Sequence, residues 1–133
     1  MASQIALDND GGRVRAIRAL LESASDGTAS ITTDTGKPVF GKVYSWQIDP
    51  FSSGSGFQPS NNFAVTIKDS DGLSVVRAPT ALSTISNAAS TEATVLDANG
   101  LTAPFVVGNK PITFAATGMG SGKKAYVQLN VLA

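Results

Sequence analysis

A glycine-rich segment near the C-terminus is the first stretch whose residue types could bind a ligand. It reads Gly118-Met-Gly-Ser-Gly-Lys-Lys, which has some of the composition of a phosphate-binding loop. The phosphate-binding pattern requires a glycine five positions before Gly122 and a serine or threonine after Lys123, but Thr117 and Lys124 occupy those positions. The residues that follow alternate as in a strand, so no helix N-terminus is expected to hold an anion. The segment is therefore interpreted as a hairpin loop.

Two acidic turns have part of the oxygen spacing of a calcium loop. They are Asp69-Ser-Asp71-Gly72 and Asp8-Asn-Asp10-Gly11, and both lack the closing glutamate. Asp and Asn side chains also bend the chain by bonding to their own backbone, which explains both sequences without a metal. Calcium binding by one of these turns stays an open alternative.

Catalytic residue types are scarce. The chain has no His and no Cys, which removes the commonest general base, the commonest transition-metal ligands and the thiolate nucleophile. Most acidic residues lie in turn sequences, and no pair is marked as facing another across a cleft. We therefore predict a non-enzymatic protein with no metal and no cofactor. The acidic residues are Asp8, Asp10, Glu22, Asp26, Asp34, Asp49, Asp69, Asp71, Glu92 and Asp97.

Three aromatic residues lie close together in one predicted strand. Alternation places Phe40, Tyr44 and Trp46 on one face, where they could stack against a sugar ring. The core of a β-sandwich uses the same residue types more often, so the core is the favoured interpretation.

Charge and hydropathy limit the partners. Ten basic and ten acidic residues leave a formal net charge of zero in 133 residues. Without a basic excess, nucleic acid and anionic lipid are not expected partners. No stretch approaches the length of a membrane span, and the N-terminus lacks the features of a signal peptide. We expect a soluble protein made in a cytoplasm, with no membrane partner.

Strand periodicity defines the elements that must position any site. Phe63, Val65 and Ile67 alternate with polar neighbours, and Asp69 to Gly72 then turns the chain, which predicts a hairpin over 63–77. Short strands with turns about every ten residues predict an all-β chain. The expected fold is a single antiparallel β-sandwich or barrel-like domain, 13–133, of about seven or eight strands with hairpin connections. Residues 1–12 are expected to form an N-terminal arm or a short edge strand.

The remaining elements follow from the same signals. The segment 13–34 fits a hairpin better than a helix, and 39–48 is the longest predicted strand. The segment 50–62 is a long Pro/Gly/Ser-rich loop and thus a candidate contact loop. The segment 78–107 is expected to be an excursion from the sheet, with a short helix within 79–90 and a strand at 93–96. Residues 111–117 and 124–132 are predicted to form a last hairpin.

The order of these motifs resembles small structural proteins of tailed bacteriophages. The similarity lies in Val14-Arg-Ala-Ile17, Ser23 to Ser30, Gly41 to Ser45, Asp49-Pro50, Pro59 to Val76, and the closing Ile112 to Gly118 and Lys123 to Leu129. The chain departs from that pattern in its longer loop 50–60 and its more apolar segment 78–107.

The resemblance implies a virion protein, assembled in the host cytoplasm, and specifically a decoration or cement protein on the head. Its implied partners are the major capsid protein or other virion proteins, and it implies a homo-oligomer such as a trimer. Two alternatives are a component of the tail or adsorption apparatus and a carbohydrate-binding β-sandwich module. Apolar residues in the arm, the long loop and the excursion are the predicted protein contacts: Ile5, Leu7, Phe51, Phe57, Leu82, Ile85, Leu101 and Phe105.

Overall fold

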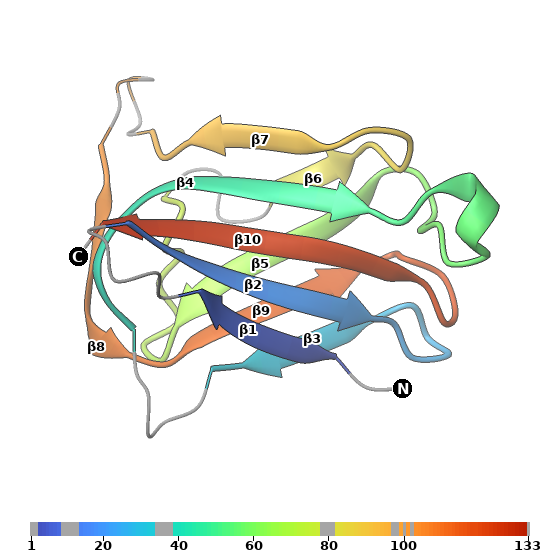
Figure 1. The fold of residues 1–133 in the computed structure, drawn as a ribbon, viewed down its shortest axis with the longest axis horizontal. Helices are drawn as coiled ribbons and strands as arrows, with labels where there is room; N and C mark the ends of the chain where they lie inside the picture. The colour runs from blue at the N-terminus through green and yellow to red at the C-terminus, as the bar shows by residue number, and fades with distance from the viewer. Residues whose placement is uncertain are drawn as a thin grey trace.

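The protein is built from two antiparallel β-sheets that pack face to face (Figure 1). The computed structural model describes residues 3–8, 14–33, 39–77, 82–96, 99, 101 and 103–132. Sheet A has the order β1 Gln4–Asp8, β2 Val14–Glu22, β10 Lys124–Leu132, β4 Val39–Pro50 and β7 Thr91–Thr94, and β8 Phe105–Lys110 also pairs with β4. Sheet B has the order β3 Ala29–Thr32, β9 Ile112–Thr117, β5 Phe63–Asp69 and β6 Leu82–Ile85. The predicted all-β sandwich is confirmed.

Alternating side chains of both sheets fill the space between them. On β2, Ile17, Ala19 and Leu21 point inward, and on β10 every second residue from Ala125 to Val131 does the same. Phe63, Val65 and Ile67 of β5 face them from sheet B. Because the strand period is two, this burial leaves the intervening residues of each strand on an outer face.

Helical structure is minimal in the described ranges. The one helical element there is the short 3-10 turn η1 Ser53–Ser55, in the loop after β4. Among these residues, none forms a helix that is long and apolar enough to cross a membrane.

The turn of the hairpin predicted over 63–77 is confirmed, but the pairing of its second strand with the first is interrupted. The Asp69 carboxylate accepts hydrogen bonds from the N–H groups of Asp71 and Leu73, at 2.9 and 3.0 Å. Ser74 then pairs with Lys68 in an isolated bridge, and beyond it the chain leaves β5. Pairing on this edge of β5 resumes with β6, so the return strand is shorter than predicted.

Two predicted hairpins are wrong although their strands are correct. β2 and β3 belong to opposite sheets, as do β9 and β10, so the turns 23–28 and 118–123 carry the chain across the sandwich. Strand alternation reports which residues face the core, but a short turn can serve either a hairpin or such an arch. The preference for strand over helix at 14–22 is confirmed.

The segment predicted as an excursion instead supplies strands to both sheets. β6 and β7 lie at the ends of the strand orders of sheets B and A, and Leu82 to Ile85 are extended where a helix within 79–90 was expected. Residues 78–81, 97–98, 100 and 102 lie outside the described ranges. At the other end of the chain, β1 pairs with β2 as an edge strand, and residues 9–13 are likewise not described.

Two irregularities in β4 separate the aromatic residues that alternation placed together. The register shifts at Gly41 against β8, and again near Tyr44, where Ser45 and Val43 pair with consecutive residues of β10. As a result Trp46 is buried, Tyr44 is half-buried and Phe40 is exposed. The predicted core role of Trp46 is confirmed, whereas the three aromatic residues do not share one face.

Gly41 is the position in β4 that we expect to tolerate a side chain least. Its φ is +124°, and an added Cβ would lie 2.6 Å from the carbonyl oxygen of Leu132. We expect Gly41→Ala to lower the free energy of unfolding by about 2 to 3 kcal/mol, measured by chemical denaturation. Gly54→Ala is the matched control, because its Cβ would meet nothing within 4 Å and its φ is not positive. Equal stability of the two variants would contradict the bulge geometry.

Candidate binding surface

The outer face of sheet A carries long polar side chains from four adjacent strands. Strand register places Arg18, Gln128, Gln47 and Glu92 side by side across β2, β10, β4 and β7. A second row contains Asn130, Ser45 and Thr94. Together with Asp49, these residues form what we call the polar face: Arg18, Ser45, Gln47, Asp49, Glu92, Thr94, Gln128 and Asn130.

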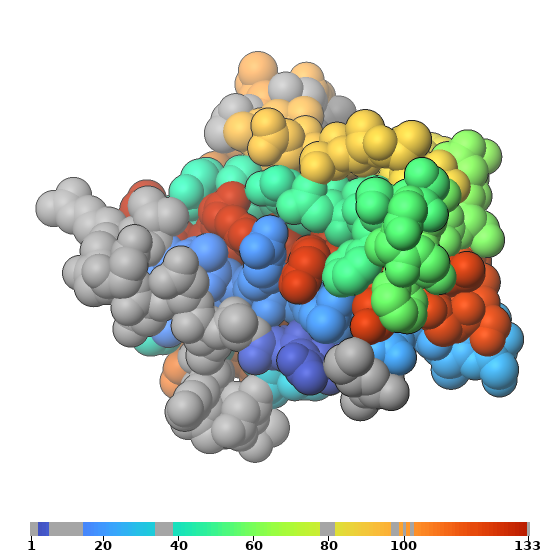
Figure 2. All heavy atoms as spheres, turned by 45° about the vertical axis from the view of Figure 1, so that its right-hand side comes forward, coloured from blue at the N-terminus to red at the C-terminus, as the bar shows by residue number. Residues whose placement is uncertain are grey.

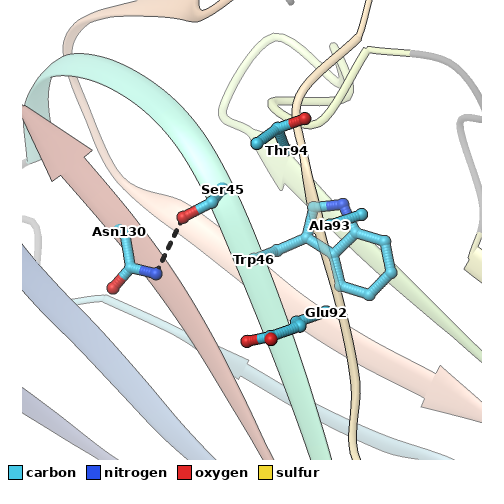
Figure 3. Close-up of a pocket in the computed structure, with 6 residues that line it drawn as sticks. All are labelled: Ser45, Trp46, Glu92, Ala93, Thr94 and Asn130. Atoms are coloured by element: carbon cyan, nitrogen blue, oxygen red, sulfur yellow. Dashed lines mark hydrogen bonds between the residues drawn. The ribbon is translucent and has the colours of Figure 1, made fainter.

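Hydrogen bonds within the polar face hold its side chains in place. Asp49 accepts bonds from Gln47 Nε2 at 3.1 Å and Arg18 Nη2 at 3.4 Å, and it also accepts a bond from the Ser90 hydroxyl. In the second row Asn130 donates to Ser45 Oγ at 2.9 Å (Figure 3). The amide of Gln128 donates to Asn130 Oδ1 at 3.0 Å. An amide has several donor and acceptor sites, so these bonds leave capacity for a ligand.

Hollows adjoin the polar face on several sides in the described part of the structure. One of about 330 Å³ is lined by Ser45, Trp46, Glu92, Ala93, Thr94 and Asn130 (Figure 3). One of about 230 Å³ is lined by Gln4, Ile5, Arg18, Leu20 and Tyr126, between the edge of the sheet and β10. A third, of about 300 Å³, separates the loop 50–58 from the turn 87–90. A ligand lying on the polar face would therefore have room at several of its borders.

An aromatic cluster borders the polar face at the end where β4 enters its long loop. Phe51 stacks on Tyr126 with ring centroids 5.5 Å apart and meets Phe57 edge-on at 6.2 Å. The Arg18 guanidinium lies 4.6 Å from the Tyr126 centroid, and the Lys124 ammonium lies 4.1 Å from that of Phe57. We call Phe51, Phe57 and Tyr126 the aromatic wall.

Phe57 is the member of the aromatic wall most open to solvent. Its exposed fraction is 39%, whereas Phe51 and Tyr126 are half-buried. Figure 2 shows the loop 51–57 in green at the surface, beside side chains of β10 in red and β2 in blue. Tyr126 already packs against both Phe51 and Arg18, so Phe57 has the ring surface best placed to meet a ligand.

The predicted contact residues are dispersed. Phe51 and Phe57 lie together in the aromatic wall, and Ile5 is partly buried against the core. Leu101 is 65% exposed, and Phe105 is partly buried beneath the Arg77 guanidinium. Phe105 begins β8, which lies at the opposite end of the sandwich from the loop 51–57 (Figure 1).

Two of the predicted contacts belong to the core. Leu82 and Ile85 are buried, because β6 closes sheet B where an exposed excursion was expected, so neither side chain offers a docking surface. Leu7 pairs with Ile17 through its backbone, and its side chain lies outside the described part of the structure. For Leu7 and the other five residues, the contact role stays a prediction.

The segments weighed as ligand loops are engaged in other interactions. Asp69 bonds to its own turn, and Asp71 pairs with Lys110, whose pKa is raised by that hydrogen bond. Among the described residues, no group of three His, Cys, Asp or Glu side chains could hold a metal ion. The glycine-rich segment is followed by β10, as its alternation predicted.

Sequence reasoning missed Arg18, Lys124 and Tyr126 as members of one site. Alternation over 124–132 does indicate that Tyr126, Gln128 and Asn130 share the face opposite the core residues. It does not indicate which strands flank them, and the neighbours Arg18 and Asp49 are 108 and 77 positions earlier in the chain, respectively, than Tyr126. Strand pairing alone brings these residues together.

Comparison with known proteins yields distant structural likenesses. No family model and no curated sequence matches the chain. The carbohydrate-binding module CBM27-1 of Caldicellulosiruptor saccharolyticus, solved with mannohexaose, has a TM-score of 0.48 at 15% identity, covering 97% of this chain and 82% of its own. The lectin domain of lectinolysin, solved with Lewis B antigen, has a TM-score of 0.45 at 12% identity, covering 95% and 74%. A carbohydrate-binding module from Cellvibrio mixtus lichenase 5A, solved with cellotriose, has a TM-score of 0.37 at 14% identity, covering 99% and 88%.

Tryptophan fluorescence tests the placement of the aromatic residues. Trp46 is the only tryptophan and is 9% exposed, so we expect blue-shifted emission with little quenching by acrylamide. The comparator is Phe57→Trp in a Trp46→Phe background, which should emit at longer wavelength and be quenched strongly, because position 57 is open to solvent. Solvent-exposed emission from Trp46 in the folded wild type would contradict its assignment to the core.

Proposed function

We propose that the chain binds carbohydrate through the polar face and the adjacent aromatic wall. The observation that carries this proposal is the row Arg18, Gln128, Gln47 and Glu92, which presents hydrogen-bonding side chains from four adjacent strands next to an exposed aromatic ring. Charged and amide side chains of this kind can form hydrogen bonds with the hydroxyl groups of a sugar, which both donate and accept such bonds. An aromatic ring matches the apolar side of a pyranose.

The side chains of the polar face are already ordered in the free protein, which favours binding at this surface. Arg18, Gln47, Gln128 and Asn130 are already restrained by hydrogen bonds to Asp49 or to one another. Ordering a long side chain on binding costs about 0.5 to 1.5 kcal/mol, so restraint in the free protein reduces that cost. Phe57 then contributes the apolar contact, and the amides of Gln47 and Gln128 contribute directional bonds.

The charges of the polar face favour uncharged sugars. Arg18 is paired with Asp49 at 3.4 Å, and Glu92 adds a further exposed carboxylate. The carboxylate of Glu92 would repel an acidic sugar. Among the residues that form the polar face, no unpaired cation would offset that repulsion. We therefore propose neutral glycans as the ligand class, over uronate or sialylated ones.

A second candidate function is attachment to other virion proteins. Val106 and Leu132 are exposed apolar residues that flank Lys42 across β8, β4 and β10, and the exposed Phe40 lies two positions before Lys42 on β4. Exposed apolar groups of this kind suit a protein partner, such as the major capsid protein or another copy of the chain in a homo-oligomer. This proposal uses a different surface from the polar face, so both functions can coexist.

The solved structures similar to this chain do not decide between the two. Several of them contain bound sugars, but TM-scores below 0.5 give those likenesses no weight here. The carbohydrate proposal depends on the side chains of the polar face. The absence of enzymatic activity stays a prediction from the sequence.

Glycan binding is tested by screening the purified protein on a glycan array and measuring the strongest ligand by titration calorimetry. We expect Phe57→Ala to weaken binding about tenfold, because it removes the exposed ring. Gln47→Ala and Gln128→Ala should each weaken binding about three- to tenfold through lost hydrogen bonds. Neutral glycans should bind more tightly than acidic ones of similar size.

Two matched controls separate the site from general surface effects. Phe40→Ala removes a ring that is 50% exposed, against 39% for Phe57, at the opposite end of β4, and Thr113→Ala removes a polar group from the outer face of sheet B. Both should retain wild-type affinity. Failure of the wild type to bind any glycan on the array, or equal losses in the controls and the site variants, would overturn the proposal.

A further inference from the structure

A lysine is enclosed at the base of the aromatic wall. The Lys124 side chain is 8% exposed, which is rare for a lysine unless its charge is compensated. Its ammonium lies 4.1 Å from the Phe57 ring centroid and 5.9 Å from that of Phe51. Glu22 Oε2 lies 3.8 Å away on the neighbouring strand and is itself 15% exposed. The charge is therefore compensated by one carboxylate and two aromatic rings.

The backbone of the same residue ties both ends of the loop. The Lys124 N–H donates to the Phe57 carbonyl at 2.9 Å, and the Lys124 carbonyl accepts from the Phe51 N–H at 3.1 Å. Between these two points the loop forms the single turn η1, closed by local bonds of Ser55 to Ser52 and Phe57. No residue of η1 is buried, so the segment 51–57 is anchored mainly at its two phenylalanines.

We propose that Lys124 is a positioning residue that fixes the orientation of Phe57 and thereby preforms the aromatic wall. An ammonium placed over a ring face is attracted by the negative charge of that face, and the attraction strengthens when water is excluded. Apart from its edge-on contact with Phe51, the ring of Phe57 has little else to hold it, since it is exposed and follows glycine. Glu22, on the neighbouring strand β2 of the same sheet, holds the ammonium in place. This inference rests in part on the proposed function, because it assigns Lys124 a role in sugar affinity without requiring Lys124 to touch the sugar.

The charge of Lys124, and not only its bulk, is required by this arrangement. Lys124→Met retains an unbranched apolar stem and removes the ammonium, while Lys124→Arg retains a cation that also stacks on aromatic rings. Lys123→Met is the matched control, because Lys123 is adjacent and half-buried but no ring contact involves its charge in the described part of the chain.

The first experiment needs no ligand. Amide hydrogen exchange of Phe51 and Phe57 is measured by NMR in the wild type and the three variants. We expect about tenfold faster exchange at these two amides in Lys124→Met, and nearly wild-type rates in Lys124→Arg and Lys123→Met. Amides of the central strand β10, such as Val127, report global stability and should change less. Unchanged exchange at Phe51 and Phe57 in a folded Lys124→Met protein would overturn the proposal, as would an equal acceleration at Val127.

The second experiment is a double-mutant cycle on ligand affinity. Lys124→Met should weaken sugar binding about three- to tenfold in the wild-type background and have no further effect in a Phe57→Ala background, because the ring that it positions is gone. Equal losses in both backgrounds would show that Lys124 acts independently of Phe57 and would overturn the positioning role. If the wild type binds no sugar, the proposed function fails, while the exchange measurement still decides whether Lys124 holds the loop.

Discussion

Backbone hydrogen bonds of the loop 118–123 hold together the end of the sandwich from which the aromatic wall projects. The loop bonds to the arch 23–28 through Ser23 and Gly27, and its Met119 carbonyl accepts from the Ser60 N–H near the end of the long loop 50–62. The backbones of the two turns approach so closely that a Cβ on Gly27 would lie 3.2 Å from the nitrogen of Gly120. Met119 is fully buried beneath this junction. Because β10 begins directly after the loop, these bonds also fix the start of β10, where Lys124 and Tyr126 lie.

The sequence predicted the strands better than their partners. Alternation located β4, β5, β9 and β10 because one face of each is buried, and burial leaves a period of two in the residue types. Pairing left no comparable local signal. The turns 23–28 and 118–123 contain the glycine and polar residues of a hairpin, yet both cross between sheets, where their glycines allow close approach of two backbones. The extra residue near Tyr44 in β4 likewise cannot be read from composition, because it depends on the register with β10.

The site was predictable only in part for the same reason. Phe51 and Phe57 could be identified as contact candidates, since two phenylalanines in a polar loop have no core partner nearby in sequence. Their actual partners, Tyr126 and Lys124, come from a strand about 70 positions later. Leu82 and Ile85 show the reverse error: in sequence they belong to an irregular segment, but the structure places them in an edge strand with their side chains in the core. Surface residues are therefore identified by sheet order and register more than by local hydropathy.

The two outer faces of the sandwich differ in a way that favours sheet A as the binding surface. Apart from Lys68, the outer face of sheet B carries mainly short side chains, including Ser30, Thr32, Thr66, Thr113 and Ala115, which extend little toward a ligand. On sheet A, the amides of Gln128 and Asn130 bond to each other along β10, Asn130 also donates to Ser45 on β4, and the Arg18 guanidinium donates to Asp49 on β4. Ordering long polar side chains on a surface costs conformational entropy, and solubility alone would be served as well by mobile lysines and glutamates. An ordered network of polar side chains beside an aromatic wall is thus more than a solvent-facing surface requires, which supports the proposal that a ligand with many hydroxyl groups binds there.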